Sequence, residues 1–221
     1  MKHFSLTFLL LGFFLFGCNQ INNKSTVVTN ETAVTVSGNG KELQEKEELQ
    51  EKEKLQELVR RLYEWHETKG SKHDFYPVSD SQNRTHIGLD LNRHKQRLTE
   101  LQQTDFFAEQ FLDNYNKLAL TIDEILKTEK IEWLVGDIPP FGNNTNPWCN
   151  CQDNPDNYWK TINITKLTLA DNTAIFIWTW GKEFEYKVNA VKENGSWKIS
   201  YLQGFDFNEM IPAKLHGNIF L

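Results

Sequence analysis

Two cysteines separated by a single residue are the part of this sequence best suited to thiol chemistry. They lie in the run Pro147-Trp148-Cys149-Asn150-Cys151. In an oxidising compartment such thiols can join as a local disulfide, which would constrain a turn and add little to the stability of the fold. A zinc site needs two further ligands, and no histidine stands at a recognised spacing from the pair. We therefore expect a disulfide or free thiols here, and neither a metal nor another cofactor; the histidines considered as ligands are His66, His73, His86 and His94.

The third cysteine, Cys18, points to lipid attachment. The chain begins with a short basic segment, and an apolar run follows it at residues 4–16. This run is too short to span a bilayer comfortably, and Gly17 stands directly before the cysteine. This pattern is typical of a bacterial lipoprotein signal peptide, residues 1–17, with acylation of Cys18 after cleavage. It predicts a protein held by its N-terminal lipid at the bacterial cell membrane or outer membrane, with its domain outside the cytoplasm. The alternatives are an uncleaved signal anchor and a secreted protein in which Cys18 is coincidental.

Three ionisable residues could act as a general acid or base. They are His66 in a predicted helix, Asp137 at the opening of a loop and Asp206 after the last predicted strand. Nothing in the sequence brings them together, and residues at such places are more often surface or capping residues. The chain also has no glycine-rich phosphate loop, nucleophile elbow or His-Glu-x-x-His motif. We favour a non-catalytic protein and keep an enzyme as the alternative.

Aromatic residues concentrated in the last third of the chain could line a ligand pocket. Their rings would suit a planar or apolar ligand, and the polar atoms of Tyr and Trp could hydrogen-bond to it. The competing interpretation is that they fill the core, as aromatic residues at strand spacing usually do. The pocket candidates are Trp178, Trp180, Tyr186, Trp197 and Tyr201.

The first half of the chain predicts a tether followed by helices. Residues 18–40 are small and polar, which is typical of a flexible tether. Residues 41–54 carry a charged repeat whose leucines fall six apart and share no helix face, so we expect a solvated helix. From Leu55 the apolar spacing becomes three and four, which predicts a packed helix.

Two loops and two more helices are expected before the strands. Residues 70–88 are polar and predict a loop, and a short helix should cover 91–101. A long amphipathic helix should follow Thr104 as its N-cap, and this helix pair should cover one side of a sheet. Residues 136–157, rich in Pro and Asn, predict a long loop.

The last third predicts an antiparallel meander. Polar and apolar residues alternate in the later strands, and the segment 173–180 is apolar on both faces, as in a central strand. The apolar phase slips between Ile164 and Leu167, which predicts a bulge that bends the sheet. The fold class is therefore α+β, with N-terminal helices packed on a curved four-stranded sheet. The four segments are 161–169, 173–180, 183–191 and 196–203.

Charge and length narrow the class of protein. The chain has 24 basic and 30 acidic residues, a net charge of −6, and its basic residues are interleaved with Glu. Such a surface lacks the clustered Lys and Arg that a nucleic-acid partner requires. The remaining length suits one domain, residues 55–207, followed by a C-terminal tail, residues 208–221.

Helices followed by a bent meander that ends in Gly195-Ser-Trp197-Lys-Ile199 resemble the nuclear transport factor two-like (cystatin-like, SnoaL-like) superfamily. With Leu62-Tyr63-Glu64-Trp65-His66, the pattern resembles a family of uncharacterised bacterial lipoprotein domains of unknown function. The resemblance covers about residues 55–207 and implies a cone of helices over a curved sheet, often enclosing a pocket. It transfers no active site, because the matching residues are core features and the superfamily includes hydrolases, isomerases, dehydratases and non-catalytic domains.

These patterns together predict a membrane-tethered, non-catalytic domain that binds an envelope protein or a small apolar ligand. The alternative is a pocket enzyme of hydrolase, isomerase or dehydratase type on the same fold. Trp148 and Trp159 lie in the long loop, where they suit either a protein-contact surface or a turn that buries them.

Overall fold

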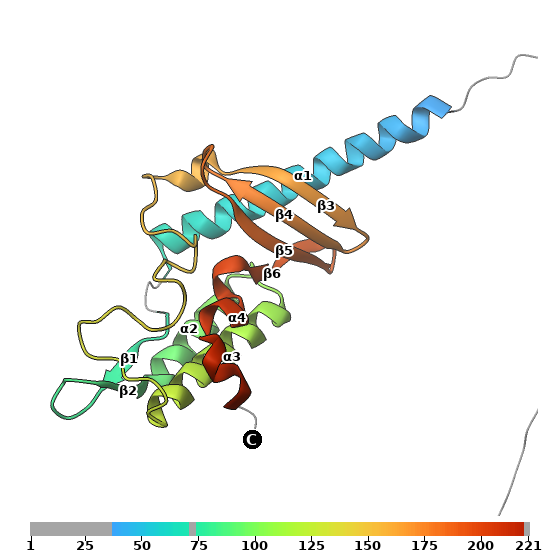
Figure 1. The fold of residues 1–221 in the computed structure, drawn as a ribbon. Helices are drawn as coiled ribbons and strands as arrows, with labels where there is room; N and C mark the ends of the chain where they lie inside the picture. The colour runs from blue at the N-terminus through green and yellow to red at the C-terminus, as the bar shows by residue number, and fades with distance from the viewer. Residues whose placement is uncertain (1–36, 71–73, 219–221) are drawn as a thin grey trace, which may run out of the picture.

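Four strands near the C-terminus form the main sheet (Figure 1). The computed structural model describes residues 37–70 and 74–218. The strands pair in chain order as an antiparallel meander, which confirms the predicted α+β class. The register breaks between Ile164 and Lys166, where the slip in apolar phase predicted a bulge, and again between Asn189 and Ala190. The strands are β3 (Asn163–Ala170), β4 (Thr173–Thr179), β5 (Tyr186–Glu193) and β6 (Ser196–Leu202).

The long helix α1 (Ser37–Thr68) lies across this sheet and projects beyond it at its N-terminal end (Figure 1). Every described side chain from 41 to 50 is exposed, whereas Leu55 and Leu62 are fully buried, so the helix divides into solvated and packed parts as predicted. The helix starts inside the predicted tether, at Ser37. Its packed part contacts β3 and β6.

The helices α2 (Leu91–Gln103) and α3 (Glu109–Lys127) pack differently from our expectation. We expected this pair to cover one side of the sheet; α1 lies across the sheet instead, and α3 packs against β6 and β2. The extended residues 106–108 add a parallel bridge to β6, with hydrogen bonds from Ala108 N to Ile199 O (2.9 Å) and from Ile199 N to Phe106 O (2.8 Å).

This bridge also explains why the predicted N-cap was wrong. Thr104 is the C-cap of α2, and α3 begins only at Glu109, after Ala108. The residues between the two helices must stay extended to reach the edge of β6, so a helix cannot start at Thr104.

A short hairpin occupies part of the segment predicted to be a loop. It consists of β1 (Pro77–Ser79) and β2 (His86–Leu89). The hairpin is stabilised from outside: Val135 N donates to Arg84 O (2.9 Å), and the Asp123 carboxylate of α3 accepts from Leu89 N (2.9 Å). Strands this short have too few alternating residues to be recognised by periodicity.

The predicted C-terminal tail belongs to the domain. Residues after 207 form most of α4 (Phe207–Met210) and the 3-10 helix η3 (Ala213–Asn218), and Met210, Ile211 and Leu215 are buried in the core. Two further 3-10 helices lie next to the main sheet in the sequence: η1 (Tyr158–Thr161) precedes β3, and η2 (Gln203–Phe205) follows β6. Residues 136–157 contain none of the helices and strands of the fold, which agrees with the loop that their Pro and Asn content predicted.

The predicted signal peptide, the lipidation site Cys18 and most of the predicted tether lie outside the described residues. Across the described ranges, no helix combines the length and apolar content needed to cross a membrane.

Candidate functional site

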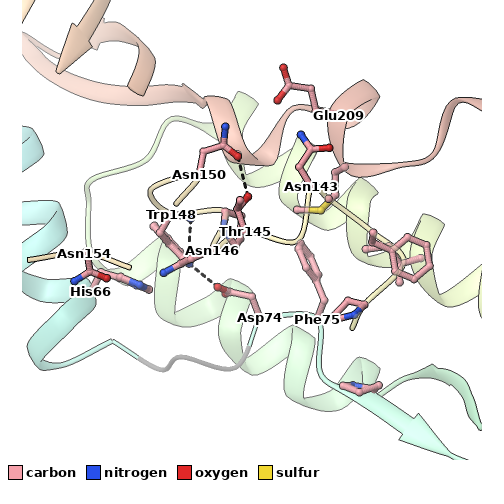
Figure 2. Close-up of a pocket in the computed structure, with 18 of the residues that line it drawn as sticks. His66, Asp74, Phe75, Asn143, Thr145, Asn146, Trp148, Asn150, Asn154 and Glu209 are labelled. Atoms are coloured by element: carbon pink, nitrogen blue, oxygen red, sulfur yellow. Dashed lines mark hydrogen bonds between the residues drawn. The ribbon is translucent and has the colours of Figure 1, made fainter. Parts of the chain in front are cut away.

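A cavity of about 520 Å³ lies among the loop of residues 139–154, the end of α1 and residues 204–210 (Figure 2). This volume is within the range of pockets that hold small ligands. Its apolar walls come from Phe75, Pro77, Ile122, Trp133, Pro139, Phe141, Pro147, Trp148 and Met210. Its polar lining comes from His66, Glu67, Asp74, Asn143, Thr145, Asn146, Asn150, Asn154 and Glu209.

The Asp74 carboxylate anchors one wall of the cavity. Its Oδ2 accepts a hydrogen bond from the indole Nε1 of Trp148 (2.5 Å). Its Oδ1 accepts from Arg97 Nε (2.9 Å) and from the Tyr115 hydroxyl (2.7 Å). Burial alone would lower the pKa of Arg97, but the carboxylates of Asp74 and Glu100 outweigh it and raise that pKa, so Arg97 stays charged. Asp74 therefore has a fixed structural role, which is to hold Trp148.

Two buried tyrosines hold the backbone of the loop. The Tyr186 hydroxyl donates to Pro147 O (2.7 Å), and the Tyr63 hydroxyl donates to Trp148 O (2.5 Å). Burial raises the pKa of both hydroxyls above the ordinary value, so both remain protonated donors. Gly204 N donates to the Tyr186 hydroxyl (3.0 Å).

Gly204 lies so close to the loop that only glycine fits. A Cβ atom at this position would overlap the carbonyl of Pro147. The loop is therefore packed directly on the backbone that follows β6, and the cavity has a rigid wall at this point.

The two cysteines lie within a tight turn of this loop. A disulfide joins Cys149 and Cys151, and Cys149 is buried. Asn146 N donates to Cys151 O (2.8 Å), and Asn150 N donates back to Asn146 O (2.6 Å). The disulfide and these bonds close the turn from 146 to 151.

The turn determines which way the Asn146 amide presents its donors, and it also engages the Asn150 amide. Asn146 Oδ1 accepts from Trp148 N (3.0 Å), and because a backbone N–H can only donate, the amide oxygen must occupy that side. Asn150 Oδ1 accepts from the Thr145 hydroxyl (2.9 Å). Within the described part of the chain neither Nδ2 group has a hydrogen-bond partner, so the cavity lining offers two amide donors to a ligand.

Of the three acid–base candidates, only His66 lines the cavity. Its ring is 3% exposed and stacks on Trp148, with centroids 4.2 Å apart and planes at 23°. His66 Nε2 lies 4.0 Å from Glu67 Oε1, which accepts from the Tyr158 hydroxyl (3.0 Å).

The other two candidates lie elsewhere and are not brought near His66. Asp137 is exposed, and its backbone carbonyl accepts from Trp133 Nε1 (3.1 Å). Asp206 is the N-cap of α4, where its carboxylate accepts from Asn208 N (2.9 Å). Asp137 is therefore a surface residue and Asp206 a capping residue, the two alternatives that the sequence offered.

None of the five aromatic pocket candidates lines the cavity. Trp178 and Tyr186 are fully buried in the core, and Trp180 stacks on Phe184 with centroids 3.6 Å apart. Trp197 donates from Nε1 to Glu51 Oε2 (2.5 Å) on α1, and Tyr201 is half-buried on β6. Apart from Tyr201, these aromatic residues therefore pack in or against the core, as the core interpretation proposed, and the cavity is lined mainly by residues outside the main sheet.

Four aromatic residues do line the cavity: Phe75, Trp133, Phe141 and Trp148. The sequence drew attention only to Trp148, and the other three were missed because periodicity is absent from loops. The one available signal was the clustering of Asn, Pro and Trp after residue 138.

Electrostatics restrict what the cavity can accept. Its described lining contains three carboxylates, Glu67, Asp74 and Glu209, and neither Lys nor Arg. Among the residues whose placement is described, no three or more His, Cys, Asp or Glu form a group that could hold a metal ion; His73 lies outside them.

The fold and site define an α+β domain with a preformed, ligand-sized cavity. Comparison with protein-family models, curated proteins and solved structures found no match to this chain. Its function must therefore be argued from the chemistry of the cavity.

Proposed function

We propose that this protein is a non-catalytic binding domain, tethered to the cell envelope by a lipid on Cys18, that takes a small uncharged ligand rich in hydroxyl groups. The observation that carries this proposal is the orientation of Asn146 and Asn150. Both amide oxygens accept within the loop, and for Asn146 the donor is a backbone N–H that permits no other orientation, so the amide nitrogens are left to donate to a bound molecule.

The charge of the lining supports an uncharged ligand. Amide donors alone would serve an anion equally well, but Glu67 and Glu209 would repel one. A hydroxyl group satisfies both sets of residues, because it accepts from an amide and donates to a carboxylate. The apolar walls suit the C–H faces of a sugar ring, which makes a neutral saccharide the ligand that fits this lining best.

The rigidity of the loop supports binding as the primary role. The loop backbone is held by Tyr63, Tyr186 and Gly204, and its indole by Asp74. A preformed site loses little conformational entropy when the ligand enters. The Asp74 carboxylate does not act in proton transfer, because it already accepts hydrogen bonds from three donors.

The position of the cavity suits a tethered protein. His66 and Ser37 are at opposite ends of α1, about 45 Å apart at the rise of an α-helix. A chain that leaves α1 at Ser37 toward a lipid on Cys18 would therefore keep the cavity away from the membrane surface. Labelling with radioactive palmitate tests the anchor: the wild type should take up label and C18A should not, and equal labelling of the two would overturn the assignment.

Calorimetric titration of the full-length protein in detergent tests the ligand. The probes are cellobiose and N,N′-diacetylchitobiose, with glucuronate as the charged comparison. We expect saturable binding of at least one neutral disaccharide and none of glucuronate.

The variant N146D sharpens this test, because it replaces the amide donor with an acceptor yet can still accept from Trp148 N. It should weaken disaccharide binding at least tenfold. The matched control N163D changes an exposed asparagine on β3 and should bind as the wild type does. Equal affinities of N146D and wild type, with both proteins folded, would contradict the proposed site.

One observation favours a pocket enzyme as the second candidate. His66, a side chain of the type that acts as a general base, lines the cavity with its Nε2 4.0 Å from Glu67 Oε1. Prolonged incubation with the same disaccharides, followed by NMR for products, tests this. Product that disappears in H66Q while disaccharide binding persists would replace the binding proposal with an enzymatic one.

A further inference from the structure

A second hollow, of about 580 Å³, adjoins the cavity. The two share five lining residues, so they adjoin along the rim that these residues form, where Gly142 N donates to Met210 O (2.8 Å). The shared residues are Gly142, Asn143, Asn150, Glu209 and Met210. Figure 2 shows Asn143 and Glu209 on the opposite side of the view from His66 and Asn154, which lie at the far end of the cavity.

The second hollow repeats the chemistry of the cavity. Gln203 lines it, and Gln203 Oε1 accepts from Lys187 N (3.0 Å). Because the backbone N–H must be the donor, the amide nitrogen of Gln203 is left to offer donors to a ligand, as in Asn146 and Asn150. Among the described residues, Gln203 Nε2 has no hydrogen-bond partner.

Three residues with side-chain amides therefore line the two hollows in succession, and the cavity, the rim and the second hollow are together called the groove below. Asn146 lines the cavity only, Asn150 lines both hollows and Gln203 lines the second hollow only. The described lining of the second hollow includes the carboxylate of Glu209 and, again, neither Lys nor Arg. A ligand that satisfied both hollows would need uncharged hydrogen-bonding groups repeated along its length.

We propose that the cavity and the second hollow form one extended site for an uncharged oligosaccharide. Its first units occupy the cavity, and the chain continues past Asn150 into the hollow at Gln203. This inference rests on the proposed function, since it assumes that the cavity takes a neutral saccharide.

The structural elements that line the second hollow favour a saccharide ligand over a peptide. An extended peptide is usually bound by the backbone of an exposed strand edge. None of the residues that line the second hollow belongs to a strand; they come from the 142–150 loop, η2, α4, the link 211–212 and the start of η3. Its polar residues carry four side-chain amides and a carboxylate, which suit the scattered hydroxyls of a sugar chain; they are Asn143, Asn150, Gln203, Asn208 and Glu209.

Calorimetry with a length series tests the extended site in the full-length protein. The probes are β-1,4-linked glucose and N-acetylglucosamine oligomers of two to six units. We expect the affinity to rise at least tenfold between two and four units and then to level off, because the groove is filled.

Isosteric variants separate the two halves of the groove. Q203E should lower the affinity for the tetramer about tenfold and leave the dimer unchanged, whereas N146D should weaken both. The control Q110E alters an exposed glutamine of α3 and should match the wild type.

Each other outcome would overturn a specific claim. If the dimer binds but longer oligomers gain nothing, the extended site is wrong and the proposed function stands. If uncharged tetrapeptide amides gain affinity with length and saccharides do not, the groove takes peptides and the inference fails. If no saccharide of any length binds, both the inference and the proposed function fail.

Discussion

The indole Nε1 of Trp148 donates a hydrogen bond of 2.5 Å to Oδ2 of Asp74. This bond joins the long loop to the chain that follows α1, and it lies in a network that also includes Arg97 and Tyr115. Trp148 is only 2% exposed. The sequence left open whether this residue forms a contact surface or a buried turn, and its position favours the buried turn.

Replacing Trp148 with Phe should lower the stability of the domain. The phenyl ring keeps part of the packing on His66 but removes the donor to Asp74, which should cost about 1–3 kcal/mol. Urea unfolding followed by circular dichroism measures this. W159F, which changes a half-buried indole that has no hydrogen-bond partner among the described residues, should have a smaller effect. A W148F variant as stable as the wild type would show that the bond has no structural importance.

Replacing Gly204 with Ala should be destabilising, because its Cβ would overlap the Pro147 carbonyl and push the loop away. The expected cost is about 1–3 kcal/mol or more, as for an overpacked core. The matched control is G181A, where a Cβ meets no atom within 4 Å. Thermal melts of the two variants should differ by several degrees; similar melting temperatures would mean that the loop moves aside without cost.

Glu51 should make stability depend on pH through its contacts between α1 and the sheet. Hydrogen bonding to Lys54, followed by the contributions of Lys192 and Trp197, holds the pKa of Glu51 at about 2 despite burial. Because this value is below the ordinary 4.5, the fold gains stability from ionised Glu51 above pH 4.5 and loses it as the pH falls toward 2.

The variant E51Q tests this dependence. At pH 7 it should cost about 1–2 kcal/mol, since the group is partly solvated and its pairs are screened. The difference from wild type should shrink between pH 4.5 and 2. E47Q, on the exposed part of α1, should change little at any pH. A difference between E51Q and wild type that is constant from pH 7 to pH 2 would contradict the assigned pKa.

Removing the disulfide with the double variant C149A/C151A should have a small effect on global stability. The bond closes a loop of only three residues, so the expected loss is roughly 1–2 kcal/mol from chain entropy. Guanidinium unfolding of the variant, and of the wild type with a reducing agent, gives two independent measurements. A loss above about 4 kcal/mol in both would mean that the bond holds the fold and not merely the turn.

Much of the secondary structure could be predicted because it depends on local periodicity. Alternation of apolar and polar residues revealed β5 and β6, a run that is apolar on both faces revealed β4, and a slip in the apolar phase revealed the bulge after Ile164 in β3. The change in leucine spacing at Leu55 marked where α1 becomes buried. Periodicity also has a limit: the hairpin of β1 and β2 is too short to show it, and the apolar residues after 207 are too few.

The candidate site could not be predicted in the same way. Its wall depends on contacts such as that of Gly204 with Pro147, and its donors depend on which backbone group each amide oxygen meets. Such contacts join residues far apart in the chain and leave no spacing signal. The aromatic stripe on the strands, which does leave one, contributed no residue to the cavity lining.

The types and spacing of neighbouring residues were enough to predict the α+β class, the order of the main elements and a lipid on Cys18. Three features became visible only in the folded chain: α1 rather than the α2 and α3 pair lies across the sheet, the last residues join the core, and a long loop lines the cavity. A periodic pattern records that a face is buried but not what buries it, and the cavity forms where segments distant in the chain pack together.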